Sequence, residues 1–346
     1  MEKEKTKTTN ISSIGEFGLI NQIAAKFRLK NSNSLLGIGD DAAVIDIGND
    51  RVQLISTDIL AEHVHFDLTF MPLKHLGYKA VAVNVSDIAA MNALAQQITV
   101  SIALSSRFTV EAVDELYEGI KLACEDYNVD LIGGDTTSSA SGLIISVTVL
   151  GTAEKTQISY RNGAREGDIL CVTGDLGGAY LGLKVLQREK EVFMGNPEMQ
   201  PELSGFEYAI RRQLRPSARM DIIHDLAESK VVPTAMIDIS DGLASELLHI
   251  AKQSQVGAII SEDNIPIDTN VYNSMVSFNM QPITAALNGG EDYELLLTLS
   301  PSDYEKIKKH PDISAIGLIK NKEDGVFLLS KQGNKYPVQA QGWVHF

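Results

Sequence analysis

The alternation of apolar and polar positions is clearest between residues 74 and 91, where it predicts one long helix. Two apolar stripes run along this helix, formed by Leu76, Ala80, Val83 and Ala90 and by Val81, Val85 and Ile88. A helix that is apolar most of the way round is normally buried, so we expect Asp87, which lies on the first stripe, to be buried with it. A carboxylate in such a position needs a compensating partner.

The same periodicities divide the rest of the chain into shorter elements. In the first half they predict helices 14–27 and 110–127 and strands 51–57, 97–104, 129–132 and 143–151. In the second half they predict strands 168–173, 235–239, 257–261 and 292–299 and helices 179–187, 206–213, 217–229 and 243–253. Residues 190–204 fit neither periodicity, and we expect them to be irregular and mobile.

The length of 346 residues allows two domains. Composition shifts near 157–167, so we predict a flexible tail at 1–13, an N-terminal domain at 14–156 and a C-terminal domain at 157–346. The charged N-terminus lacks the apolar segment of a secretion signal, and no apolar run approaches the length of a membrane span. These features favour a cytoplasmic protein with no membrane partner.

The net charge of −15 argues against nucleic acid and against an anionic membrane surface as partners, because both require a basic footprint. An acidic chain can still bind nucleotides when a divalent cation bridges the two. The two cysteines, Cys124 and Cys171, lie far apart inside apolar segments. This spacing is typical of reduced core thiols and not of a zinc site or a disulfide framework.

Five segments place aspartates within apolar runs or at their edges. They are Gly39-Asp40-Asp41, Ser56-Thr57-Asp58, Asn84-Val85-Ser86-Asp87, Gly133-Gly134-Asp135 and Asp238-Ile239-Ser240-Asp241. No comparable set of lysines and arginines lies nearby in the sequence, so bound divalent metal is the simplest compensation for these charges. Oxygen-rich sites suit Mg²⁺ or Ca²⁺, and a cluster of Mg²⁺ ions is typical of phosphoryl transfer.

Each aspartate segment also has a structural interpretation. Asp40 and Asp41 follow glycines, as in a tight turn, and Asp58 or Asp241 could cap or end an element. The segment from Asp238 begins like an EF-hand calcium loop, but its twelfth position is His249 and not glutamate. Calcium-loop identity therefore fails, and the other structural interpretations stay open.

Two further segments offer weaker signals. The 174–178 loop could bind phosphate through backbone N–H groups, but it matches no known phosphate-loop pattern, and a turn is the simpler interpretation. His63 and His65 could suggest zinc, yet soft ligands are missing around them. We expect two polar loop histidines, one of them in contact with a ligand.

Taken together, the motifs resemble the thiamine-monophosphate kinase family, whose superfamily also holds aminoimidazole ribonucleotide synthetase and selenophosphate synthetase. The matching stretches run in family order at 37–43, 56–58, 79–91, 131–136, 237–243 and 289–295. The resemblance implies an α/β (α+β) protein with the two-domain aminoimidazole ribonucleotide synthetase-like fold. It also implies a homodimer in which the N-terminal sheets pair.

The activity implied by the resemblance is phosphorylation of thiamine monophosphate by ATP, giving thiamine diphosphate and ADP. The acids suit such a reaction, since Mg²⁺ ions can neutralise two phosphates and hold them in line. The attacking phosphate oxygen is already largely ionised near neutral pH. We therefore expect direct transfer and name no protein base.

The resemblance also assigns residues to ligands. Several Mg²⁺ ions would be held by Asp41, Ser56, Thr57, Asp58, Asp87, Asp135, Asp238 and Asp241. The nucleotide would contact Tyr117, Gly134, Asp135, Arg161 and Ser240. His65, Glu291 and Trp343 would contact the thiamine side, where an aromatic face suits a cationic thiazolium.

Other members of the superfamily fit less well. A selenophosphate synthetase is expected to carry a reactive cysteine or selenocysteine near its N-terminus, and the first cysteine here is Cys124. The hydrogenase-maturation relative is expected to end in cysteine, whereas this chain ends in Phe346. A purine-precursor synthetase and a metal-dependent phosphohydrolase remain as alternatives, and analysis of the products separates them from a kinase.

Overall fold

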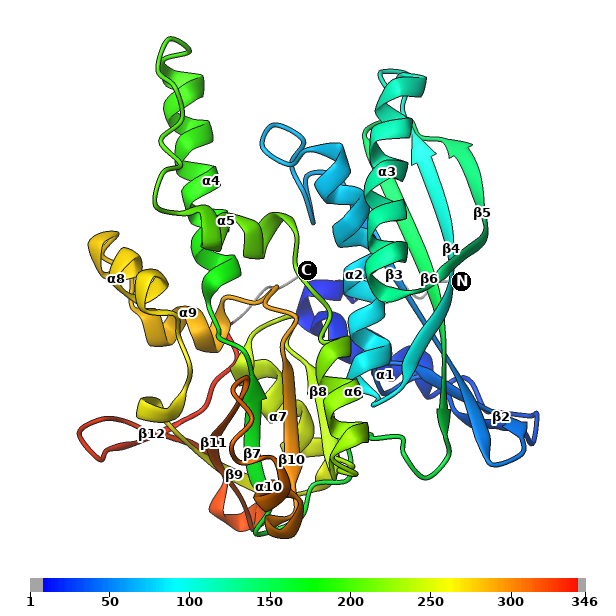
Figure 1. Cartoon of the computed structure of the whole chain (residues 1–346), viewed down its shortest axis with the longest axis vertical. Helices are drawn as coiled ribbons and strands as arrows, with labels where there is room; N and C mark the ends of the chain where they lie inside the picture. The colour runs from blue at the N-terminus through cyan, green and yellow to red at the C-terminus, as the bar shows by residue number, and fades with distance from the viewer. Residues whose placement is uncertain (1–8, 342–346) are drawn as a thin grey trace, which may run out of the picture.

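The computed structural model describes residues 9–341 and contains two β-sheets (Figure 1). The N-terminal sheet has the strand order β1 (Ser34–Leu36), β2 (Ala43–Gly48), β3 (Arg51–Ala61), β6 (Leu143–Glu154), β4 (Leu94–Leu104) and β5 (Asp130–Ser138). The C-terminal sheet has the order β13 (Lys335–Pro337), β12 (Val326–Leu329), β9 (Gly257–Ser261), β11 (Ile313–Lys320), β7 (Ile169–Thr173), β10 (Leu295–Leu299) and β8 (Ala235–Asp238).

Helices connect and cover these strands. They are α1 (Gly15–Ala24), α2 (Leu73–Ala90), α3 (Val110–Tyr127), α4 (Gly178–Gly195), α5 (Glu207–Leu214), α6 (Met220–Glu228), α7 (Leu243–Ser254), α8 (Thr269–Ser277), α9 (Pro282–Asn288) and α10 (Pro301–Ile307). Single 3-10 turns lie at Ile11–Ser13, Glu262–Asn264 and Lys322–Asp324. Between residues 9 and 341, no helix is both long enough and apolar enough to cross a membrane.

Most strand pairs are antiparallel; β4 with β5 and β9 with β12 are parallel. In β3 the side chains alternate, so Val52, Leu54 and Leu60 are buried on the face that α2 covers. Ser56 and Asp58 have the same parity and lie on that face, whereas Thr57 lies on the opposite, exposed face. The strand thus delivers Asp58 toward α2.

Helix α2 lies against both sheets. It contacts β3, β4 and β6 on one side and β8, α5 and α6 on the other. One hydrophobic cluster accordingly includes Leu54 of β3, Val85 of α2 and Leu297 of β10. The predicted burial of this helix is confirmed, with fourteen of its residues buried. Its polar positions are therefore held rigidly between the two halves of the chain.

Several predicted boundaries were wrong in an informative way. Strand β3 continues to Ala61, so Asp58 lies inside a strand and does not end it. Strand β5 continues to Ser138 because the edge beside β4 stays paired through the glycines. Gly134 is required there, since a Cβ at this position would lie 1.8 Å from the carbonyl oxygen of Val100.

Two further differences lie in the second half. Residues 190–204 were predicted to be irregular, but α4 remains helical to Gly195. Glu189 in its last turns accepts a hydrogen bond from the backbone N–H of Glu202 (2.8 Å), which ties the following segment to the helix. The strand predicted at 292–299 begins only at Leu295, because Glu291 and Tyr293 have positive φ values of 58° and 52°.

The contact between α2 and α3 generates the first prediction. A Cβ at Gly77 would lie 2.0 Å from the carbonyl oxygen of Leu116, which is backbone and cannot move aside. We expect Gly77→Ala to lower the free energy of unfolding by about 3 kcal/mol, as overpacked cores do. Urea denaturation measures the loss. Gly195→Ala, where nothing lies within 4 Å, is the matched control, and an equal loss in both variants would contradict the argument.

Candidate active site

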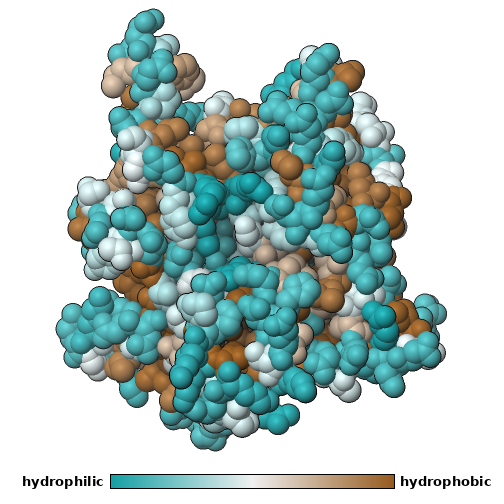
Figure 2. All heavy atoms as spheres, in the orientation of Figure 1, coloured by the Kyte–Doolittle hydropathy of each residue, from teal (hydrophilic) through white to brown (hydrophobic). Residues whose placement is uncertain are grey.

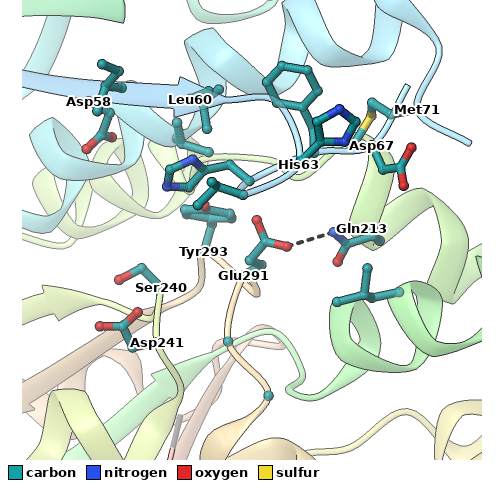
Figure 3. Close-up of a pocket in the computed structure, with 18 of the residues that line it drawn as sticks. Asp58, Leu60, His63, Asp67, Met71, Gln213, Ser240, Asp241, Glu291 and Tyr293 are labelled. Atoms are coloured by element: carbon teal, nitrogen blue, oxygen red, sulfur yellow. Dashed lines mark hydrogen bonds between the residues drawn. The ribbon is translucent and has the colours of Figure 1, made fainter. Parts of the chain in front are cut away.

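A cavity of about 760 Å³ opens between the two halves of the chain. On the face drawn in Figure 2 the surface is hollowed between the α4–α5 side and the α2–α3 side, and hydrophilic residues gather around the hollow. In Figure 3, Asp58, Ser240 and Asp241 lie toward one end, Met71 and Asp67 toward the other, and Glu291 and Tyr293 between them. At the outer rim Lys190 of α4 pairs with Asp67 at 2.5 Å.

Three carboxylates converge at the inner end of the cavity. Oxygens of Asp41, Asp87 and Asp238 all lie within 4.8 Å of one another. Asp41 comes from the loop after β1, Asp87 from the last turn of α2, and Asp238 from the end of β8. Asp87 is half-buried and lines the cavity, so it is less buried than we expected from the apolar helix around it. An all-oxygen set of this kind fits a hard divalent cation.

The motif at 84–87 holds this cluster in place. Asn84 accepts a hydrogen bond from the backbone N–H of Asp58 (3.0 Å) and so fixes β3 against α2. Ser86 donates to Asp238 (2.6 Å), and Ser56 donates to Asp87 (2.5 Å). Two neighbouring residues of one helix thus fix the strand that carries Asp58 and orient the carboxylate of Asp238. Ser86 and Asn84 were absent from the predicted site residues because their targets are distant in sequence.

Burial and the proximity of like charges both change the acidity of these groups. Burial, and then the charges of Asp58, Asp238 and Asp41, raise the pKa of Asp87 well above its ordinary value. Burial and the charge of Asp41 raise the pKa of Asp58 to about 6 and that of Asp238 to about 7. Without a cation, the cluster therefore retains protons at a pH where isolated aspartates have none.

Arg161 supplies part of the compensation. Its guanidinium pairs through two nitrogens with Asp41, and its Nε lies 3.7 Å from Asp40. Its backbone N–H also donates to Asp40 (3.2 Å). The absence of cations near these acids in the sequence was therefore misleading, because Arg161 reaches them from 120 residues away. We predicted that Arg161 contacts the nucleotide. In the structure its guanidinium instead contacts the carboxylates of Asp40 and Asp41.

The middle of the cavity carries a different group of polar residues. Glu291 accepts one hydrogen bond from Lys79 Nζ (2.6 Å) and one from Gln213 Nε2 (2.7 Å; Figure 3). His65, on the cavity wall, accepts a bond from the backbone N–H of Ala61 (3.0 Å) through Nδ1. Lys79 and Gln213 were missed, since a lysine and a glutamine inside apolar helical patterns gave no signal of a ligand site.

The turn after β8 shapes the adjoining wall. The backbone N–H of Glu291 donates to the carbonyl oxygen of Ser240 (2.6 Å). Gly242, with φ of 114°, precedes α7, and the helix has no side-chain cap. The capping interpretation of Asp241 is therefore wrong, and Asp241 instead lines the cavity beside Ser240 (Figure 3).

The 174–178 loop does not present a phosphate site. Asp292 accepts hydrogen bonds from the backbone N–H groups of Gly177 (2.8 Å) and Ala179 (3.4 Å) at the start of α4. Its carboxylate already fills the place that a phosphate would take at a helix N-terminus. The interpretation of this loop as a turn is confirmed.

Four other predicted residues lie away from the cavity in the single chain, and a fifth is not described. The Thr57 hydroxyl donates to the carbonyl oxygen of Val147 (3.1 Å) on the outer face of the sheet, away from the carboxylates. Gly134 and Asp135 are exposed on the edge strand β5, and Tyr117 of α3 packs against the core. Trp343 lies outside the described residues. For Thr57, Tyr117, Gly134 and Asp135, contacts within one chain give no support to the predicted roles, which stay predictions.

Comparison with known proteins agrees with this arrangement. The AIR synthase related protein family matches through its N-terminal domain at residues 39–153 and its C-terminal domain at residues 165–324. Thiamine-monophosphate kinase of Bacillus subtilis is 35% identical over 338 residues, covering 96% of this chain and 99% of that protein. The Aquifex aeolicus kinase is 35% identical over 339 residues, covering 97% and 99%.

Solved structures give the same result. The structure described as AaThiL complexed with AMPPCP and TMP superimposes with a TM-score of 0.85 at 33% identity, covering 99% of this chain and 100% of that one. The hydrogenase maturation protein HypE in complex with ATP superimposes with a TM-score of 0.67 at 19% identity, which shows a shared fold only.

The raised pKa values predict how stability depends on pH. Asp238 has a pKa of about 7 in the folded chain against 3.8 ordinarily, so between these values the folded state binds more protons than the unfolded state. The metal-free chain should therefore lose about 2 kcal/mol of unfolding free energy between about pH 5 and about pH 7.5. Urea denaturation in a chelator measures this.

Two controls accompany the pH measurement. Excess Mg²⁺ should reverse the trend, because a cation bound to the folded state favours the ionised carboxylates. Asp238→Asn should make the profile in the chelator less steep, with the raised pKa values of Asp58 and Asp87 accounting for the slope that remains. If the free energy of unfolding of the metal-free chain rises between about pH 5 and about pH 7.5, burial and like charges do not raise the pKa of Asp238 as we infer.

Proposed function

This chain belongs to the thiamine-monophosphate kinase family of AIR synthase related proteins, and we propose that it phosphorylates thiamine monophosphate with ATP. The products would be thiamine diphosphate and ADP. The observation that carries the proposal is the convergence of Asp41, Asp87 and Asp238 at one end of a cavity of about 760 Å³, which Asp87 and Asp238 line. The relative described as complexed with AMPPCP and TMP supports the pairing of a nucleotide with a second phosphate ester.

The donor set supports Mg²⁺ as the cation, since it consists of mutually repelling carboxylates without soft ligands. Asp41, Asp87 and Asp238 would hold the metal, with Asp58 and Asp241 on the adjoining wall. When bound, Mg²⁺ would neutralise phosphate charge and help to align the two phosphates for in-line attack.

The chain's own residues have two tasks in this reaction. Ser56, Ser86 and Asn84 fix the carboxylates and the strand that carries Asp58 through hydrogen bonds. His65 and Glu291 line the cavity beyond the acids, where the heterocyclic part of the substrate would lie. No side chain needs to remove a proton, because the attacking phosphate oxygen is already ionised. Direct transfer without a phosphoenzyme follows.

Product analysis tests the proposed function. The purified chain is incubated with ATP, Mg²⁺ and, in parallel, thiamine monophosphate, thiamine or an aminoimidazole precursor. We expect ADP and thiamine diphosphate in equal amounts with thiamine monophosphate, and no turnover of the other two. Free phosphate as the main product would indicate a hydrolase, and turnover of the aminoimidazole precursor alone would indicate a purine-pathway enzyme.

Asp87→Asn provides a test of the metal cluster. Removing one like charge should leave the metal-free protein folded and no less stable, since the variant loses repulsion from Asp58 and Asp238. Turnover at saturating Mg²⁺ should fall at least about 100-fold, comparable to the loss of a strong transition-state contact. Asp114→Asn, which neutralises an exposed acid on α3, is the matched control. Unchanged turnover in Asp87→Asn would contradict the assignment.

We also propose a cytoplasmic homodimer, in which the N-terminal sheets pair. The outer face of this sheet exposes Ile59 (59%) and Ile132 (59%), and the edge strand β5 is exposed along its whole length. A second copy covering this face would bury these side chains. In such a dimer, Gly134, Asp135 and Tyr117 of one copy would contact a ligand bound by the other copy. Light scattering that gives the mass of one chain would contradict the dimer.

A further inference from the structure

Lys79 is a charged side chain with no exposed surface. It lies in the middle of α2, and its exposed fraction is 0%. Its Nζ pairs with Glu291 at 2.6 Å and lies 3.5 Å from the carbonyl oxygen of Gln213. A lysine buried in this way costs several kcal/mol unless it is well paired. An apolar residue of similar volume would fill the same position without the free-energy cost of burying a charge, so the presence of the charge needs an explanation.

The explanation begins with Glu291, which is the partner that faces the cavity. Its side chain is 30% exposed and lines the wall, with one oxygen bonded to Lys79 and the other to Gln213. These two donors come from α2 and α5, so two separate helices fix the carboxylate. Each oxygen still has a lone pair for a ligand in the cavity.

An isolated carboxylate here would conflict with the substrate of the proposed function. The cavity wall already carries Asp58, Asp87, Asp238 and Asp241, and Glu291 would add a further negative charge. A thiamine-type ligand has a cationic ring, which a carboxylate attracts, and a phosphate, which a carboxylate repels. Coulomb forces of this kind act across a whole cavity of low dielectric.

We propose that Lys79 is a positioning residue that neutralises Glu291 and thereby lets the cavity accept the phosphorylated form of a cationic heteroaromatic substrate in preference to the unphosphorylated form. The proposal rests on the proposed function, of which it explains the selectivity. Gln213 has a separate role in it, because this neutral amide fixes the second oxygen of Glu291 without changing the charge of the wall.

Binding measurements on charge variants test this proposal. Isothermal titration calorimetry with Mg²⁺ present gives the Kd of thiamine and of thiamine monophosphate for each variant, and their ratio measures the preference for phosphate. Lys79→Met adds one net negative charge to the wall, so the preference for the monophosphate should fall about tenfold. Glu291→Gln removes one negative charge and should shift the preference in the opposite direction.

The double variant carries the decisive outcome. Lys79→Met with Glu291→Gln has the charge of the original pair, so its preference should return to within about threefold of the original value, even if both ligands bind more weakly. It also leaves no unpaired buried charge, so it stays informative if Lys79→Met alone does not fold. Equal weakening of both ligands in every variant would mean that Lys79 has only a packing role, which would overturn the proposal.

Two matched controls separate charge from position. Lys74→Met removes a lysine from the same helix whose partner is the exposed Glu118 (3.4 Å), and its preference should be unchanged. Gln213→Leu removes the neutral donor and should weaken both ligands together without altering their ratio. A change of ratio in Lys74→Met equal to that in Lys79→Met would show that the effect is long-range and not specific to Glu291, and this would also overturn the proposal.

The same experiments distinguish this inference from the proposed function. If the original chain phosphorylates thiamine monophosphate but the ratio of the two Kd values is the same with and without Lys79, only the role proposed for Lys79 is contradicted. If the original chain binds both ligands with a ratio that follows the charge variants but makes no thiamine diphosphate, the activity fails and the charge argument stands. If it binds neither ligand, both fail.

Discussion

The repulsion among carboxylates at the junction of the two sheets is the constraint on which the rest of this structure depends. Asp41, Asp87 and Asp238 come from three separate elements and are held close enough to share one ion. Burying these carboxylates and holding like charges together both cost free energy, as the raised pKa values of Asp58, Asp87 and Asp238 show. The serine hydroxyls and the Arg161 guanidinium around the cluster offset that cost in the absence of metal.

Helix α2 packs into the hydrophobic core and also holds the charged groups of the site in place. Its apolar faces are buried against both sheets, while Asp87 lines the cavity and the buried Lys79 and Ser86 donate hydrogen bonds to carboxylates of the cavity wall. Lys79 and Asp87 are separated by about 12 Å along the helix axis. Helix α2 thus sets the distance between Glu291, which Lys79 holds at the heterocyclic end of the cavity, and the metal-site carboxylates Asp87 and Asp238.

The sequence predicted those features that depend on local periodicity. Helix α3 was placed at its observed bounds of Val110–Tyr127 and β9 at Gly257–Ser261, because both have clear patterns and distinct ends. The convergence of Asp87 and Asp238 was also anticipated, since an acid inside an apolar run has few structural explanations. Long-range pairing could not be read in this way: Arg161 reaches Asp41, and Lys79 reaches Glu291, across 120 and 212 residues. The positive φ of Glu291 likewise could not be read from the sequence.

The hydrophobic cluster shared by the two sheets has a consequence for how the chain loses its structure. Because Leu54, Val85 and Leu297 belong to one continuous core, neither half can open without exposing apolar surface of the other. Both halves should consequently melt in a single cooperative transition, unlike domains joined by a linker. Proteolytic nicking near residue 157 should then leave the two fragments associated, with neither stable alone.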